Sequence, residues 1–253
     1  MLLLDQVSFA YPHQSAVFAG FTWKVERGDA WTILGPSGCG KSTLLYLLAG
    51  LRFPQEGNIL VDGQPLRRPR PHTGLIIQDY GLLPWATVRQ NAALGQDIRG
   101  MYGPDGIHAP LGDSASESVE AWLERLGLNS VADQYPGQIS GGQRQRTAIA
   151  RTLVLRPDIL LMDEPFSSLD APTRESLQAL TLELWCERAL TLVLVTHSIE
   201  EAAVMGRKIL LLGAPPNRSA TIIDNPHAGD PGFRDSQDYL HLVRELRARL
   251  ETP

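Results

Sequence analysis

The sequence is poor in three features that each mark a class of protein. It has two cysteines in 253 residues, Cys39 and Cys186, too few for a disulfide framework, which points to a reducing compartment. No apolar run approaches the roughly 20 residues that a helix needs to cross a bilayer. The net charge of −5 lacks the positive surplus that binding to a nucleic-acid backbone requires. We therefore expect a chain that does not itself span a membrane and has no nucleic-acid partner.

Two short segments could be mistaken for exceptions. Residues 1–4 are apolar, but Asp5 interrupts them and they lack the length and cleavage site of a secretory signal. Arg67, Arg68 and Arg70 form a small basic group, and the proline between them indicates a solvated loop.

The chain contains instead a series of short apolar runs. Residues 159–162 and 192–195 are continuously apolar, as expected for parallel strands that are covered on both faces. Helical patterns lie between several of the runs, so the sequence predicts an α/β core. Further strands are expected at 17–25, 30–34, 59–61, 74–77 and 209–212.

Between about residues 82 and 156 the strand-like runs stop and helical patterns dominate, for example at 117–126. We interpret residues 82–156 as a helical subdomain inserted into an α/β core formed by about 1–81 and 157–253. Residues 1–253 then form a single domain, which is long enough to bury a substantial core.

Composition also predicts loops and a terminal helix. Residues 100–118 are rich in Gly, Pro, Asp and Ser and are expected to form a surface loop, and 213–232 hold many prolines and turn residues. Residues 239–251 are expected to form an amphipathic helix. Its apolar stripe could pack on its own domain or dock to a partner; it consists of Leu242, Val243, Leu246 and Leu250.

A glycine-rich loop with a lysine directly follows the apolar run 30–34. Its glycines let the backbone wrap tightly, so that N–H groups and the start of the next helix can face one phosphate. Lys41 would reach the β and γ phosphates, and the Ser42 hydroxyl would coordinate Mg²⁺. A plain glycine turn is the alternative, but a strand before and a helical pattern at 44–49 favour a phosphate site. The predicted nucleotide-binding residues are Gly35, Pro36, Ser37, Gly38, Cys39, Gly40, Lys41, Ser42 and Thr43.

The strand predicted at 159–162 ends in two carboxylates, Asp163 and Glu164. An acidic residue at a strand end beside the phosphate loop can hold Mg²⁺, and a neighbouring carboxylate can orient and deprotonate a water. We assign Asp163 to the metal and Glu164 to the water that attacks the γ-phosphate. Acidic pairs also occur as helix caps, which is the alternative interpretation.

A second anion-seeking helix start is predicted at Ser140, Gly141, Gly142 and Gln143. A monomer with one phosphate loop has little use for a second one. At this point the chain resembles, over almost its whole length, the nucleotide-binding subunit of ATP-binding cassette (ABC) transporters. Residues 35–43 match the Walker A motif of that family, 160–164 its Walker B motif and 140–143 its signature motif.

Four further positions carry the resemblance. They are Gln78 for the Q-loop, Asp170 in the D-loop 167–170, His197 for the switch histidine and Tyr11 for the aromatic residue that stacks on adenine. One departure is Ile139, where leucine is usual. The implied fold is a P-loop ATPase core, with a RecA-like parallel sheet and an antiparallel β subdomain, plus the helical subdomain.

The resemblance also implies an ATPase that is complete only as a head-to-tail dimer, here a homodimer. Each ATP would lie between the phosphate loop of one subunit and residues 140–143 of the other, with Asp170 at the dimer contact. Gln78 would ligate Mg²⁺ through its carbonyl, and His197 would donate to the γ-phosphate. Lys41 and Glu164 complete the expected catalytic set.

The segment after Gln78 indicates what the ATP is used for. Leu83 and Trp85 could form an apolar surface for a helix of another protein, or the core of the helical subdomain. The resemblance to importers of nitrate, sulfonates and taurine favours the first interpretation. It implies membrane permease subunits, an extracytoplasmic solute-binding protein, and a peripheral location on the cytoplasmic face of the membrane.

Two other functions remain to be compared with an importer ATPase. A soluble ABC ATPase could act as an assembly or regulatory module without a permease. A small-molecule kinase could use the same phosphate loop, but such an enzyme leaves residues 140–143 unexplained.

Overall fold

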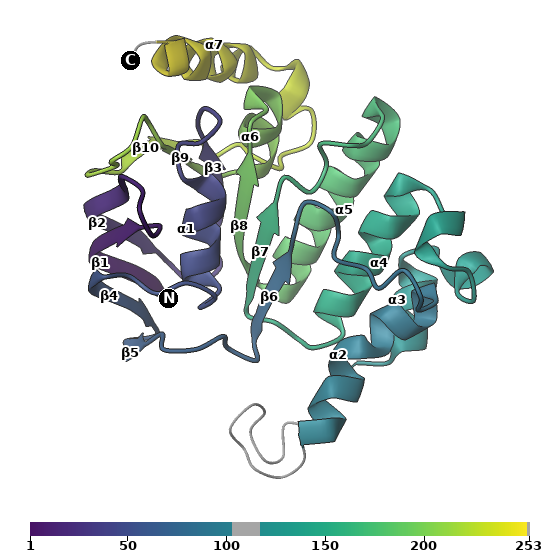
Figure 1. Cartoon of the computed structure of the whole chain (residues 1–253). Helices are drawn as coiled ribbons and strands as arrows, with labels where there is room; N and C mark the ends of the chain where they lie inside the picture. Colours follow the sequence, from purple (N-terminus) through teal and green to yellow (C-terminus); the bar gives the residue numbers. More distant parts are fainter. Residues whose placement is uncertain (103–116, 252–253) are drawn as a thin grey trace.

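In the computed structural model, the described residues are 1–102 and 117–251, and they form a central sheet, a smaller antiparallel sheet and helices around both (Figure 1). The central sheet explains the continuously apolar runs, because its middle strands are buried along their whole length. In order across the sheet, the strands are β10 (Thr221–Asp224), β9 (Lys208–Leu211), β3 (Ala30–Leu34), β8 (Thr191–Thr196), β7 (Ile159–Asp163) and β6 (Thr73–Ile76). Strands β9 to β6 run parallel, and β10 pairs antiparallel with β9.

The antiparallel sheet lies beside the first helix. Its strands, in order, are β2 (Ala16–Val25), β1 (Leu2–Ala10), β4 (Glu56–Val61) and β5 (Gln64–Pro65). Helix α1 (Lys41–Leu48) packs its leucines into one cluster with side chains of both sheets. A helix that is apolar nearly all round suits this doubly covered position. The start of α1 is therefore held rigidly between two sheets.

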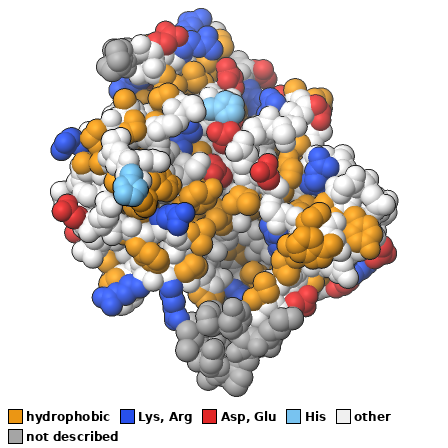
Figure 2. Space-filling model, viewed as in Figure 1, with side chains coloured by type: hydrophobic (Ala, Val, Ile, Leu, Met, Phe, Trp, Pro, Cys, Tyr) orange, Lys and Arg blue, Asp and Glu red, His pale blue; other side chains and the backbone are white. Residues whose placement is uncertain are grey.

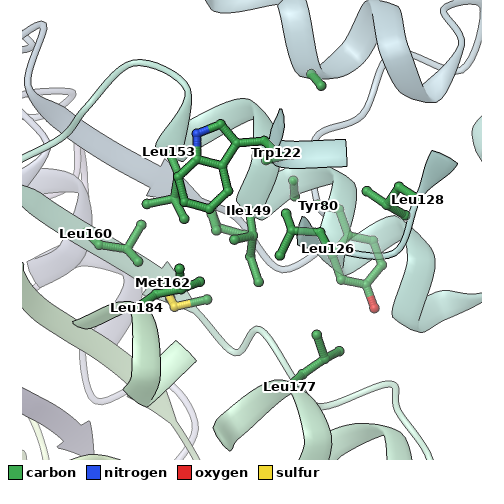
Figure 3. Close-up of a cluster of buried hydrophobic side chains, with 14 of the residues drawn as sticks. Tyr80, Trp122, Leu126, Leu128, Ile149, Leu153, Leu160, Met162, Leu177 and Leu184 are labelled. Carbon is green, nitrogen blue, oxygen red and sulfur yellow. The ribbon is translucent and has the colours of Figure 1, made fainter. Parts of the chain in front are cut away.

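Helices cover the other face of the central sheet. They are α4 (Gly141–Leu153), α5 (Ala171–Arg188) and α6 (Ile199–Met205). Helices α2 (Val88–Tyr102) and α3 (Val119–Arg125) pack on α4, with short 3₁₀ turns at Asn129–Val131 and Pro136–Gln138. Figure 3 shows how their side chains meet: Trp122 of α3 and Ile149 of α4 lie in one cluster with Met162 of β7 and Leu177 of α5. Among the described residues between β6 and β7 there is no strand. We propose 82–156 as the limits of this helical subdomain.

The end of the chain packs on its own domain. Helix α7 (Gln237–Glu251) follows a 3₁₀ turn, Phe233–Asp235, and lies beside α6 (Ile199–Met205) (Figure 1). Leu242 and Leu246 are buried against Ala202 and Ala203 of α6. This contact decides between the two interpretations of the apolar stripe in favour of intramolecular packing.

Three sequence-based expectations need correction or limits. The turn-rich stretch 213–232 contains a strand, β10, which the prolines around it concealed. The loop with Arg67 and Arg68 is exposed as expected, but Arg70 in it is half-buried, and its guanidinium pairs with both carboxylate oxygens of Asp158 at 3.0 and 2.9 Å. Of the loop expected at 100–118, the first residues belong to α2, and 103–116 lie outside the described residues.

Candidate functional site

Four neighbouring parallel strands end at one edge of the central sheet, and each carries a predicted site residue at or just beyond its end. The order β3, β8, β7, β6 brings Gly35, His197, Glu164 and Gln78 to that edge. Ligands of α/β proteins bind at the carboxyl ends of such strands. Residues separated by more than 160 positions in the chain are thus collected by sheet topology.

The phosphate loop is held in shape by contacts that only glycine allows. A Cβ on Gly35 would lie 2.5 Å from the carbonyl oxygen of Leu212, so a side chain cannot fit there. Gly40 has φ 106°, which other residues rarely adopt, and α1 begins directly after it. The buried ammonium of Lys41 donates to the carbonyls of Gly35 and Pro36, both at 2.9 Å.

A hydroxyl and a carboxylate meet beside this loop. Ser42 Oγ donates to Asp163 Oδ1 at 3.1 Å. The pKa of the Asp163 carboxyl is raised, first by burial and also by the neighbouring charge of Glu164. The Ser42 hydrogen bond and the Lys41 charge act in the opposite direction. Mg²⁺ prefers such oxygen donors and is usually held by one or two carboxylates with substrate phosphates. The residues present therefore fit Mg²⁺, although residues 1–102 and 117–251 hold no cluster of three or more His, Cys, Asp or Glu for a metal.

Glu164 and His197 touch each other. The imidazole Nδ1 of His197 lies 3.1 Å from Glu164 Oε2, and the histidine side chain is 62% exposed. Glu164 has φ 45°, and its N–H donates to the carbonyl of Val195 on β8 at 2.9 Å. A left-handed conformation costs a non-glycine residue about 1–2 kcal/mol. The hydrogen bond to Val195 and the contact with His197 offset that cost and keep Glu164 at the carboxyl end of β7.

A cavity of about 620 Å³ opens at this edge. The Tyr11 hydroxyl lies 3.2 Å from Thr43 Oγ1, and the Tyr11 ring packs edge-on against Phe9 at a centroid distance of 5.1 Å. Gln14 and Val17 were not predicted, because no motif marks them. The lining residues are Tyr11, Gln14, Val17, Ser37, Gly38, Gly40, Lys41, Ser42, Thr43, Gln78, Glu164 and His197. Cys39 points elsewhere: it is buried, and burial raises the pKa of its thiol.

The other predicted anion site is not part of this cavity. Ser140 precedes α4 and accepts from the N–H of Gln143 at 3.2 Å, while the Gln143 side chain accepts from the Ser140 N–H at 2.9 Å. This reciprocal capping box satisfies two donors of the helix start and leaves Ser140 exposed. Gly142 is buried, and a Cβ there would lie 2.6 Å from Thr173 Cγ2. The structure thus brings residues 35–43, 163–164 and 197 together, but not 140–143.

Asp170 is the N-cap residue of helix α5. Its exposed carboxylate accepts from the N–H of Thr173 at 3.3 Å. Hydrogen bonds from the side chain and the backbone of Thr173 lower the pKa of Asp170. Two residues earlier, Ser168 Oγ lies 2.7 Å from the Tyr80 hydroxyl. The segment after Gln78 and the predicted D-loop are therefore in contact within one chain.

Helix α4 grips that same segment. The Arg151 guanidinium donates to the carbonyls of Tyr80 and Gly81 at 2.7 and 2.6 Å, and burial lowers the pKa of Arg151. Beyond it, Leu82 packs on the core, whereas Trp85 is 73% exposed. Leu82 therefore fits the interpretation of this segment as part of the core, and Trp85 fits the interpretation as an exposed apolar surface. Figure 2 shows other apolar side chains exposed on the helical side of this face (right).

A buried asparagine fixes the shape of the Trp85 segment. Asn91 accepts from the Leu83 N–H at 2.8 Å and donates to the carbonyls of Leu83, Ala86 and Thr87 at 3.1, 2.9 and 3.0 Å. Four hydrogen bonds from one side chain make the segment a defined surface. The sequence did not reveal this role, because the residue type does not show that an asparagine in the first turn of a helix bonds to the backbone of the preceding segment.

Comparison with known proteins identifies this arrangement. The family described as ABC transporter matches residues 18–167, more than half of the chain. The chain belongs to the ABC transporter family. Over 253 residues it is 35% identical to the aliphatic sulfonates import ATP-binding protein SsuB of Bacillus cereus. The alignment covers 98% of this chain and 95% of the relative.

Two further similarities agree with this membership. The ABC chain is 40% identical over 222 residues to the taurine import ATP-binding protein TauB of Pseudomonas aeruginosa, covering 86% of this chain and 80% of the relative. Its fold matches a dimeric, post-hydrolysis ATP-binding cassette, MJ0796, bound to ADP and Pi. The TM-score is 0.72 at 27% identity, with 88% of this chain and 98% of that chain covered.

These findings confirm the predicted fold class and activity. The protein is an ABC ATP-binding cassette: it binds nucleotide and hydrolyses ATP. Within residues 1–102 and 117–251, no helix has the length and apolar character to span a bilayer.

Proposed function

We propose that this ABC protein is the ATP-hydrolysing subunit of an importer that takes up a small sulfonate-type or related solute. The observation that carries the proposal is the separation of two anion sites. The cavity with Lys41 and Glu164 lacks residues 140–143, whose first residue, Ser140, is exposed elsewhere on the chain. A second copy placed head to tail would bring those residues to the phosphate. The importer relatives and the dimeric neighbour support this arrangement.

The residues in the cavity have distinct proposed roles. Lys41 exchanges its bonds to two loop carbonyls for the β and γ phosphates, and the backbone of 35–43 cradles them. Tyr11 stacks on the adenine. Glu164 orients the attacking water and accepts its proton, while His197, in contact with that carboxylate, donates to the γ-phosphate.

The proposed metal is Mg²⁺, held by Ser42, Asp163 and Gln78. When bound, it neutralises charge on the phosphates. Ser42 and Asp163 already lie within hydrogen-bond distance of each other, and Gln78 lines the same cavity. Asp170 is proposed to contact the second subunit next to the closed site.

Dimer formation gives the first test. In the Glu164→Gln variant the cavity keeps its shape but loses the base, so ATP should bind and trap a stable dimer, measured by light scattering after size exclusion. Ser140→Arg should abolish turnover while each subunit still binds nucleotide. A mixed dimer of Ser140→Arg and wild-type subunits that hydrolyses ATP at both sites would contradict the shared site, and so would full turnover by a strict monomer.

The permease is proposed to dock on the surface formed by Leu83 and Trp85, and the protein would then lie peripherally on the cytoplasmic face of the membrane. An extracytoplasmic solute-binding protein would deliver the solute. Replacing Leu83 and Trp85 by serine should weaken co-purification with the membrane subunits and leave nucleotide binding unchanged. Uptake assays of the whole complex with taurine, other sulfonates and nitrate test the solute. The alternative of an assembly module predicts no co-purifying membrane protein.

A further inference from the structure

The loop after β9 passes next to the phosphate loop and carries a buried asparagine. Asn217 is 6% exposed, and both ends of its side-chain amide are bonded. The Nδ2 group donates to the carbonyl of Cys39 at 2.8 Å, and Oδ1 accepts from the N–H of Gly213 at 3.0 Å. Asn217 therefore connects the phosphate loop with the end of β9.

The backbone of the same residue holds a wall of the nucleotide cavity. The N–H of Asn217 donates to the carbonyl of Val17 at 2.9 Å, and its carbonyl accepts from the N–H of Ala19 at 3.0 Å. Val17 lines the cavity, and a Cβ on Gly40 would lie 2.5 Å from Val17 Cγ1. One residue thus ties the central sheet, the antiparallel sheet and the phosphate loop together.

The bond to Cys39 has a consequence for the next peptide group. A trans peptide is planar, and its carbonyl and N–H point in opposite directions. Because Asn217 holds the Cys39 carbonyl, it also fixes the Gly40 N–H, which points away from Asn217. Gly40 lines the cavity and directly precedes α1, where backbone N–H groups bind anions.

We propose that Asn217 is a positioning residue for ATP binding: it sets the orientation of the 39–40 peptide and so presents the Gly40 N–H to the nucleotide phosphates. Asn217 does not line the cavity and acts only through the loop. The inference rests on the proposed binding of phosphate by residues 35–43. It adds a residue that lies in no motif of the chain.

The chain offers a matched control. Asn225 is 4% exposed, and its Nδ2 donates to the carbonyls of Ala203 and Gly206 at 2.7 and 2.8 Å, away from the cavity. Asn217→Ala removes the side-chain bonds to Cys39, Gly213 and, at 3.4 Å, Val17, and Asn225→Ala removes two side-chain bonds from a similarly buried position. Both should lower the Tm, but only the first changes the phosphate loop.

The experiment measures binding of a fluorescent ATP analogue, together with Tm, for wild type, Asn217→Ala, Asn225→Ala and Lys41→Ala. We expect Asn217→Ala to weaken binding about tenfold, equivalent to one misaligned phosphate contact of about 1.4 kcal/mol. Asn225→Ala should stay within about twofold of wild type. Asn217→Asp, which keeps the acceptor for Gly213 but loses the donor to Cys39, should behave like Asn217→Ala. Amide exchange of peptide 36–43 should accelerate in the Asn217 variants alone.

The outcomes separate two failures. If Asn217→Ala binds as tightly as wild type while Lys41→Ala does not, Asn217 is merely structural and the inference is wrong. If Lys41→Ala also binds normally, the loop is not the phosphate site and the proposed function fails with it. Should Asn217→Ala and Asn217→Asp not fold, Asn217→Leu is measured, because it keeps about the same side-chain volume but has no donor for the Cys39 carbonyl; binding equal to wild type without faster exchange would again overturn the inference.

Discussion

At Gly142 we predict that a substitution which lowers the Tm will raise it instead when a neighbouring residue is also changed. The Cβ position of Gly142 lies 2.6 Å from Thr173 Cγ2, inside the contact distance of two carbons. Overpacking of this kind costs about 1–3 kcal/mol. Alanine in a helix regains about 0.5–1 kcal/mol relative to glycine. Gly142→Ala should therefore destabilise the nucleotide-free protein by about 1 kcal/mol, which lowers Tm by about 2–4 °C in a chain of this length.

Thr173→Ser removes only the offending methyl group. In that background Gly142→Ala no longer meets the methyl, so it should raise Tm by about 1–3 °C through helix propensity. The assay is thermal unfolding of the four proteins of the double-mutant cycle without nucleotide. Gly141→Ala is the control from the same motif: its Cβ would meet flexible Leu169 Cδ2 at 3.2 Å, and Thr173→Ser should not alter its effect. Equal Tm changes for Gly142→Ala in both backgrounds would refute the reasoning.

Two other predictions concern the switch region. Burial raises the pKa of Glu201, a carboxyl that accepts from Gln178 Nε2 at 3.3 Å and has Thr196, Arg174 and His197 as neighbours. Between pH 4.5, the pKa of the unfolded state, and the higher pKa of the folded state, the folded protein binds more protons than the unfolded protein. The free energy of unfolding therefore falls as pH rises between these two pKa values and no longer changes above the folded pKa. Glu201→Gln should remove this slope in urea unfolding between pH 4.5 and 8; an unchanged slope would contradict the assignment. His197→Ala should reduce kcat of ATP hydrolysis by about 10²-fold or more while ATP still binds, and an unaltered kcat would remove His197 from the reaction.

Local pattern sufficed for those parts of the fold where one residue type repeats. The buried strands β7 and β8 are apolar at nearly every position, and the glycine loop before α1 has a spacing that few other structures need. Strand β10 escaped prediction because it has four residues, three of them exposed, on the edge of the sheet between prolines. Too few alternations remain there for a period to be detected.

The supporting residues of the site could not be predicted for a different reason. Asn217 lies 178 positions from Cys39, and Asn91 uses its side chain on backbone groups of a loop. Neither bond leaves a mark in local composition, since the residue type does not show whether an asparagine in a loop, such as Asn217, or in the first turn of a helix, such as Asn91, bonds to backbone groups elsewhere. The cavity residues Gln14 and Val17 are near the site only because the antiparallel sheet folds back beside α1.

The hydrogen bonds from Arg151 to the carbonyls of Tyr80 and Gly81 link α4 mechanically to the segment after Gln78. The helix has 13 residues and so is about 20 Å long, with Ser140 at its free tip and Arg151 near its other end. If a partner that binds at Ser140 shifted α4, Arg151 would pass the displacement to the segment that leads to Trp85. Any coupling free energy between the two ends of the helix would then be the same in both directions.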